Sequence, residues 1–168
     1  MRVPTRKGGE FTNLKPDPYI TKKKFDELVL KLKKMKTKQP GLAQEVSRLA
    51  EGGDFSENAG YQTAKWQLRG LNQAVLDLEE QLKMAIIIKP NKKSKIVSLG
   101  SEVTVKIDDK EKTYLILGSA EIDLAKNIIS HHSPIGQALL NKKVSEIVKV
   151  QLGDRETVCE IMKVESNK

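Results

Sequence analysis

Two carboxylates three residues apart are the part of this sequence best suited to chemistry. Asp54 and Glu57 lie within GGDFSENAGY, residues 52–61, and no lysine or arginine occurs between Glu51 and Ala64. Mg²⁺ commonly takes one or two carboxylates and completes its coordination with water and phosphate oxygens. We therefore expect this segment to deliver acid ligands either to a divalent cation whose other ligands belong to a partner or to a basic pocket.

The same two residues also fit the start of a helix. Asp is a favoured N-cap, and a Glu at the third helical position completes a capping box, with glycines making the tight turn before it. Acids at a helix N-terminus also interact favourably with the helix dipole. Spacing alone favours this capping role and position in the chain favours the ligand role, but one carboxylate can serve both.

Two segments with the same apolar rhythm flank this turn and must position it. Apolar residues recur there at alternating steps of three and four, which is the seam of a coiled coil. We expect an antiparallel helical hairpin with residues 52–58 at its tip, Thr21 as its first N-cap, and a kink or local break at Pro40. A compact helical bundle would need a third long amphipathic helix, and the sequence offers none. The seam residues are Phe25, Leu28, Leu32, Met35, Gln39, Leu42, Val46 and Leu49, then Tyr61, Ala64, Leu68, Leu71, Val75, Leu78, Leu82 and Ala85.

The pattern changes to strands from residue 96 onward. VTVKID, KTYLIL and ETVCEIMKV alternate with a period of two, while DDK and GDR are typical of hairpin turns. SPIGQALLNKK predicts a short helix with Ser133 as N-cap and Pro134 at its first position. The fold class is therefore α+β: a flexible basic tail (1–18), a coiled-coil hairpin (19–89) and a compact β-sheet domain with one short helix (90–168).

Composition narrows the class of protein. The net charge is +8 and its excess lies in the first 24 residues, which favours a polyanionic neighbour such as nucleic acid or simply a solubilising surface. One cysteine and two histidines exclude a disulfide framework and a four-ligand zinc site. No apolar run is long enough for a membrane span, and no signal peptide is present, so we expect a cytoplasmic protein. We assign packing or surface roles to His131 and His132, and a core position to Cys159.

GGDFSENAGY resembles the GD-[LFR]-x-ENAxY signature of the bacterial transcript cleavage factors, the GreA/GreB family. KQPGLAQEV is similar to a first-arm segment of that family with a proline inside the helix. IVSLGSEVTV, TYLILGSAEID and ISHHSPIGQALLNKKV are similar to successive pieces of its C-terminal domain. The resemblance covers roughly residues 19 to 165, and the tip motif together with SPIGxAL is its specific part.

The resemblance implies a function and a partner. The coiled coil would enter the secondary channel of bacterial RNA polymerase while an FKBP-like C-terminal domain docks at the rim. Asp54 and Glu57 would help to hold the second Mg²⁺ of the polymerase active site, and the polymerase would cut its own backtracked RNA by two-metal hydrolysis. The protein would then be an accessory factor rather than an enzyme, expected as a monomer, with no cofactor bound alone.

The resemblance also assigns roles to other residues, each with a plainer alternative. Ser133, Pro134 and Ile135, the segment assigned to docking, could instead be an ordinary helix start. Tyr61 could be a plain seam residue, and Lys65 and Arg69 could be part of a solvated face. The assigned residues are Ser133, Pro134 and Ile135 for docking on the polymerase, Phe55, Asn58 and Tyr61 for support of the tip, and Lys65 and Arg69 for contact with the extruded RNA.

Three rival functions remain open at this level. Family members often carry an acid where this chain has Gly60, which leaves room for a paralogue that blocks the channel and inhibits polymerase. A peptidyl-prolyl isomerase would need an aromatic-lined pocket, but Tyr114 is the single aromatic residue after residue 90. A coiled coil that binds free RNA or DNA through its lysines would show steeply salt-dependent affinity.

Overall fold

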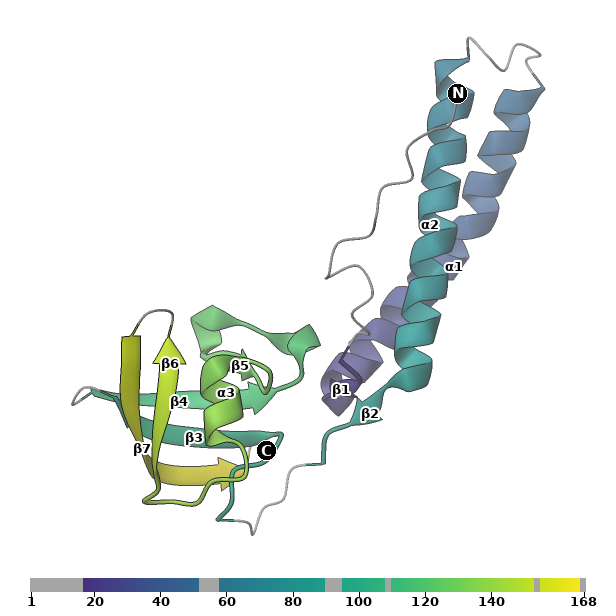
Figure 1. The fold of residues 1–168 in the computed structure, drawn as a ribbon. Coiled ribbons are helices and arrows are strands. Elements are labelled where there is room, and N and C mark those ends of the chain that lie inside the picture. Colours follow the sequence, from purple (N-terminus) through teal and green to yellow (C-terminus); the bar gives the residue numbers. More distant parts are fainter. Residues whose placement is uncertain (1–16, 52–57, 90–94, 108–109, 153–154, 167–168) are drawn as a thin grey trace, which may run out of the picture.

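The structure is a computed structural model that describes residues 17–51, 58–89, 95–107, 110–152 and 155–166. A long helical hairpin projects from a small β domain (Figure 1). The predicted α+β class, with an N-terminal hairpin followed by a β-sheet domain carrying a short helix, is confirmed. Within the described residues, no helix is long and apolar enough to cross a membrane.

The hairpin consists of α1 (Lys22–Ala50) and α2 (Ala59–Met84), which lie side by side in opposite directions (Figure 1). Every predicted seam residue is buried or half-buried, and Ala64, Val75 and Leu78 are the buried residues of α2. The polar member of the seam, Gln39, donates a hydrogen bond to Asn72 Oδ1 at 2.9 Å. The predicted seam is therefore confirmed, and packing along it holds two helices that have little other core.

Of the kink or local break expected at Pro40, the break is wrong, because α1 runs without interruption from Lys22 to Ala50. The kink stays a prediction. A proline inside a helix removes one backbone hydrogen bond and costs about 3 kcal/mol. Met35 and Leu42, on either side of it, both face residues of α2. Because the seam keeps its phase across the proline, packing against α2 holds both segments in one helix. The predicted N-cap is confirmed, since Thr21 Oγ1 accepts a hydrogen bond from Lys24 N at 3.2 Å.

The β domain is built on a five-stranded mixed sheet in the order β5-β4-β3-β7-β6. The β3–β4 and β6–β7 pairs are antiparallel hairpins, as the turn motifs predict, and β4 pairs with β5 in parallel. Two short 3-10 helices and α3 connect β4, β5 and β6. The bounds are β3 (Ser101–Ile107), β4 (Lys110–Leu117), η1 (Ser119–Glu121), η2 (Leu124–Lys126), β5 (Ile128–Ser130), α3 (Pro134–Leu139), β6 (Ile147–Leu152) and β7 (Arg155–Ser166).

The core of this domain lies between α3 and the sheet. Leu139 of α3 is fully buried with inward residues of β3, β4 and β7. Cys159 belongs to this core with no exposed surface, as its place in an alternating strand predicts. The core is aliphatic, and Tyr114 packs only at its edge.

A set of contacts that we call the joint ties the base of the hairpin to the β domain. β1 (Tyr19–Ile20) pairs in parallel with β2 (Ile86–Ile87), which closes the base of the hairpin. Glu121 of η1 accepts hydrogen bonds from Thr21 N at 2.7 Å and from Thr21 Oγ1 at 2.6 Å. Gly118 approaches the backbone of Tyr19 so closely that a Cβ atom there would lie 1.8 Å from the Tyr19 carbonyl oxygen. The joint therefore leaves no space for a side chain at residue 118.

Asp17 completes the joint from just before β1. Its carboxylate accepts hydrogen bonds from Ser119 N at 2.7 Å and from Tyr19 N at 3.1 Å. Burial raises the pKa of Asp17, but these backbone N–H groups, the Ser119 side chain and the neighbouring His131 together lower it by more, so the pKa lies below its ordinary value. His131 Nδ1 lies 3.4 Å from Asp17 Oδ2, and the His131 ring meets Tyr19 edge-on with centroids 5.7 Å apart.

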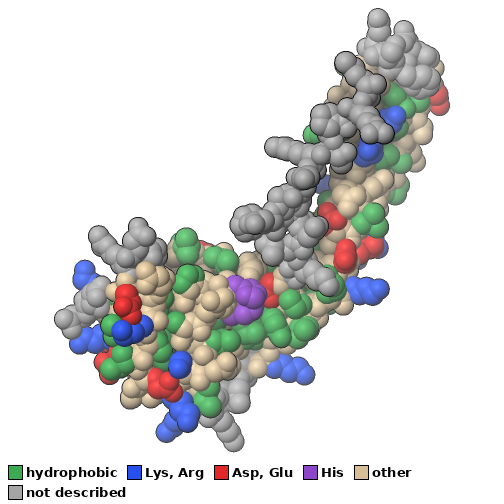
Figure 2. Space-filling model, in the orientation of Figure 1, with side chains coloured by type: hydrophobic (Ala, Val, Ile, Leu, Met, Phe, Trp, Pro, Cys, Tyr) green, Lys and Arg blue, Asp and Glu red, His purple; other side chains and the backbone are tan. Residues whose placement is uncertain are grey.

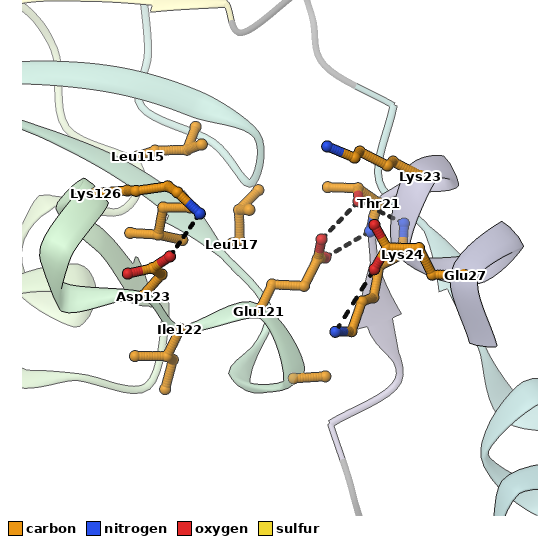
Figure 3. Close-up of a pocket in the computed structure, with 12 residues that line it drawn as sticks. Thr21, Lys23, Lys24, Glu27, Leu115, Leu117, Glu121, Ile122, Asp123 and Lys126 are labelled. Carbon is orange, nitrogen blue, oxygen red and sulfur yellow. Dashed lines mark hydrogen bonds and ion pairs between the residues drawn. The ribbon is translucent and has the colours of Figure 1, made fainter. Parts of the chain in front are cut away.

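The joint borders a cleft of about 510 Å³ between the start of α1 and the β domain, and Figure 3 shows the residues that line this cleft. Glu121 extends across the cleft to Thr21, while Asp123 and Lys126 pair on its far wall at 2.8 Å. Leu115 and Leu117 supply apolar lining. The orientation of α1 against the β domain therefore rests on a few polar contacts beside an open cleft.

Candidate functional site

In the sequence, the acid pair falls between α1 and α2, at the two helix ends that are farthest from the β domain (Figure 1). Asp54, Phe55 and Glu57 are outside the described residues, so their predicted roles stay predictions. The residues that anchor this segment are described. α1 ends at Ala50 with Glu51 as its C-cap, and α2 begins at Ala59.

Asn58 anchors the tip to both helices. Its Oδ1 accepts a hydrogen bond from Tyr61 N at 2.9 Å, and its Nδ2 donates to the Leu49 carbonyl at 3.1 Å. Asn58 is therefore the N-cap of α2, and the expected capping box with Asp54 as N-cap is wrong. Asn is as good an N-cap as Asp, and it alone offers an N–H to the last turn of the other helix. α2 therefore begins at Ala59, which follows both acids in the sequence.

We expect Asn58→Ala to loosen the tip without unfolding the hairpin. Loss of the N-cap costs about 1 kcal/mol, and the Leu49 carbonyl loses its side-chain donor as well. Amide hydrogen exchange in the first turn of α2 should accelerate about fivefold or more, while exchange near Val75 stays unchanged. Asn58→Asp is the matched control, because it keeps the cap acceptor and removes only the donor. Unchanged exchange in Asn58→Ala would contradict the anchoring role.

The lack of a side chain at Gly60 fits the close packing of Asn58 and Leu49 around it. A Cβ atom at residue 60 would lie 3.3 Å from Asn58 Oδ1 and 3.8 Å from a methyl group of Leu49. The cap and the end of α1 therefore occupy the space beside the first turn of α2. The absence of a side chain at residue 60 leaves room for the Asn58 cap and for the end of α1. It also means that this chain lacks the acid that is often found at this position in the family that the tip motif resembles.

An aromatic and cationic face follows on α2. Lys65 Nζ lies 5.5 Å from the centroid of the Tyr61 ring, and Tyr61 itself is half-buried in the seam. Trp66 is 78% exposed and lines a shallow hollow with Arg69. Lys65 and Arg69 are both exposed, as the sequence predicts. The sequence does not group Trp66 with these two cations, because Trp66 lies off the seam. An aromatic ring flanked by cations suits the bases and phosphates of a single strand.

The docking segment combines a structural and an exposed part. Ser133 Oγ accepts from Gly136 N at 3.1 Å and donates to the Ser130 carbonyl at 2.7 Å. Ile135 is half-buried against the core, while Pro134 is exposed. The helix-start alternative therefore accounts for Ser133 and Ile135, and Pro134 is the residue of the three that is open to a partner.

Comparisons with known proteins agree with this arrangement. The family described as "Transcription elongation factor, N-terminal" matches residues 18–87, and "Transcription elongation factor, GreA/GreB, C-term" matches residues 91–166. The chain is 39% identical over 145 residues to a transcription elongation factor GreA of Clostridium botulinum, covering 84% of this chain and 89% of that protein.

Two further proteins are similar to this chain. A transcription elongation factor GreA of Clostridioides difficile is 35% identical over 149 residues, which cover 86% of this chain and 94% of that protein. Among solved structures, the GreA factor homolog 1 (Gfh1) protein of Thermus thermophilus is 20% identical with a TM-score of 0.40, covering 88% of this chain and 97% of that one.

Proposed function

The chain belongs to the GreA/GreB family of transcription elongation factors, and we propose that it binds bacterial RNA polymerase through the secondary channel and stimulates cleavage of backtracked RNA. The observation that carries this proposal is a pair of long antiparallel helices, whose far ends flank the acid pair in the sequence. With 29 residues in α1, the hairpin extends about 44 Å from its base at about 1.5 Å per residue. Such a projection is long and narrow enough to carry its tip into a channel.

Asp54 and Glu57 would hold a Mg²⁺ ion jointly with the polymerase. Carboxylate oxygens are the ligands that Mg²⁺ prefers, and two of them leave positions for water and phosphate. Once bound, this ion supplies charge stabilisation to the reacting phosphodiester. Asn58 rather than Asp54 caps α2, so the start of this helix does not require Asp54 as its cap. The protein would thus supply ligands to an active site that belongs to its partner, with no cofactor of its own.

Other residues would position the factor and the RNA. Pro134 would contact the polymerase rim, with Ser133 and Ile135 holding the segment in shape from within the β domain. Lys65 and Arg69 would face the extruded RNA, since both are exposed on the α2 face that also carries Trp66. Asn58 and Tyr61 would brace the tip, and Phe55 would shape it.

A backtracked elongation complex with 3′-labelled RNA tests this function. In the presence of Mg²⁺, we expect the factor to accelerate release of a short 3′ RNA at least about tenfold, and the shortened transcript to resume elongation. Heat-denatured factor is the control. Binding to polymerase without faster cleavage would instead favour the channel-blocking inhibitor, and salt-sensitive binding to free RNA in place of polymerase would favour the nucleic-acid-binding coiled coil.

A further inference from the structure

We propose that Asp17, His131 and His132 form a binding site for a borderline divalent metal ion, of which Zn²⁺ is the representative. The site would bridge the segment before the hairpin and the β domain. It is separate from the Mg²⁺ chemistry proposed for the tip, both in position and in ligand type. The sequence alone suggests no acid partner for the two histidines, and folding brings Asp17 to them from more than one hundred residues away.

The ligand atoms are already close to a coordinating arrangement. One oxygen of Asp17 and one ring nitrogen of each histidine lie within 4.8 Å of one another. Asp17 Oδ2 and His131 Nδ1 are 3.4 Å apart, and the two rings are tilted by 39° with centroids separated by 3.9 Å. Ligands of a tetrahedral Zn²⁺ ion are about 3.3 Å apart, because each lies about 2.0 Å from the metal. A small rotation of His132 would close the site.

The residues around the site hold two of its ligands in place. The side chain of Asp17 is 4% exposed and is held by the backbone N–H groups of Ser119 and Tyr19. The side chain of His131 is 12% exposed and packs against the Tyr19 ring. Outer contacts of this kind orient metal ligands and raise affinity.

His132 gives the site its access to solvent. Its ring is exposed, while its backbone N–H donates to Ser130 Oγ at 3.0 Å, which fixes the chain from which the ring projects. Figure 2 shows the histidines as one patch at the surface where the β domain meets the hairpin. A metal ion can therefore reach the site without opening the fold.

The ligand set selects the class of metal. Two imidazoles and one carboxylate suit Zn²⁺, Co²⁺ or Ni²⁺, whereas Mg²⁺ and Ca²⁺ take oxygen ligands. Three protein ligands leave a fourth position for water or for a group of a partner. The site directly precedes Ser133 and Pro134, so an ion there would fasten the hairpin to the β domain beside the proposed docking segment.

The chain contains only two histidines, so imidazole signals report this site alone. Metal-free full-length protein should be titrated with Zn²⁺, with calorimetry for stoichiometry and nuclear magnetic resonance for the two rings. We expect one Zn²⁺ per chain and shifts in both imidazoles. His132→Ala should weaken binding at least about tenfold and should not disturb the fold, because that ring is exposed.

Two further variants separate this site from its alternatives. Asp54→Ala, Glu57→Ala should bind Zn²⁺ with unchanged affinity, which would exclude the tip as the ligand. Asp17→Asn should lose affinity at least about tenfold, because the carboxylate charge is lost with little change in shape. Equal affinity in Asp17→Asn and the unmodified chain would overturn the bridge between the two parts. Equal affinity in His132→Ala, or unshifted imidazoles, would overturn the site itself.

Discussion

Stimulated RNA cleavage is expected to fall at least about 100-fold when Asp54 and Glu57 are replaced together by Ala. A metal ion contributes several kcal/mol of charge stabilisation to phosphodiester hydrolysis, and each 1.4 kcal/mol or so is a factor of about ten in rate. Without the two carboxylates, the factor would lose the ligands that we propose for this ion. The measurement is the single-turnover cleavage rate of backtracked, 3′-labelled RNA at saturating factor.

A measurement of binding to polymerase distinguishes loss of the Mg²⁺ ligands from loss of the complex between the factor and polymerase. The hairpin seam and the β domain lie outside the substituted residues, so the double variant should compete with the unmodified factor for polymerase at a similar concentration. Asp54→Asn, Glu57→Gln is the matched variant, since it keeps the shape of both side chains and removes their charge. It should be as inactive as the alanine variant. Cleavage near the unmodified rate in either variant would contradict the ligand role.

Replacing either acid alone should lower the cleavage rate by more than half of the combined effect on the activation free energy. Groups that hold one ion act as a unit, so removal of either can cost nearly as much as removal of both. Raising the Mg²⁺ concentration should partly restore the single variants, in which one carboxylate remains to bind the ion. The double variant should show little restoration.

The second large effect is expected at Gly118, far from the tip. In Gly118→Ala the new methyl group would lie 1.8 Å from the Tyr19 carbonyl oxygen, so β1 and the β domain cannot keep their present contact. Overpacking of this kind costs about 1–3 kcal/mol. Displacement of β1 would also strain the hydrogen bonds of Asp17 and Glu121 across the joint. The direction in which the hairpin leaves the β domain would then no longer be set.

We expect Gly118→Ala to reduce cleavage at least about tenfold while leaving both the helices and the tip acids intact. Misplacement of a ligand by about 1 Å can cost a factor of about 100 in rate. The loss should appear mainly in the maximal rate, with a smaller change in the concentration that gives half-saturation, because the docking face of the β domain is retained. Circular dichroism should report unchanged helix content.

Gly70→Ala is the matched control for this substitution. It makes the same chemical change on α2, where a Cβ atom would meet nothing within 4 Å, and it removes a residue that costs up to about 1 kcal/mol in a helix. It should leave the cleavage rate unchanged and raise the melting temperature. Equal activity of Gly118→Ala and Gly70→Ala would contradict the role of the joint in positioning the hairpin.

The features of this protein that can be predicted from its residues alone are those set by local patterns. The alternating spacing of apolar residues predicted both helices and their seam, and period-two alternation predicted the hairpins of the sheet. Thr21 and Ser133 were identified as N-caps because a cap is a contact between neighbours three residues apart. The tip motif led to the family in the same way, through residue types at short spacing.

Two local predictions were wrong because packing between the helices outweighed local preference. Pro40 does not break α1, since seam residues on both sides of it are held against α2. Asn58 rather than Asp54 caps α2, because its amide also binds the end of α1. Neither effect is visible in a single helix, as each depends on where the other helix lies.

The way in which the hairpin meets the β domain is evident only from the folded structure. The Asp17–Ser119 and Thr21–Glu121 hydrogen bonds join residues 102 and 100 positions apart, and no periodic pattern links such positions. Asp17 is separated from His131 and His132 by an even longer stretch of sequence, which hid their grouping. Local spacing specifies elements because neighbours along the chain are neighbours in space, whereas a joint between elements depends on the packing of the whole chain.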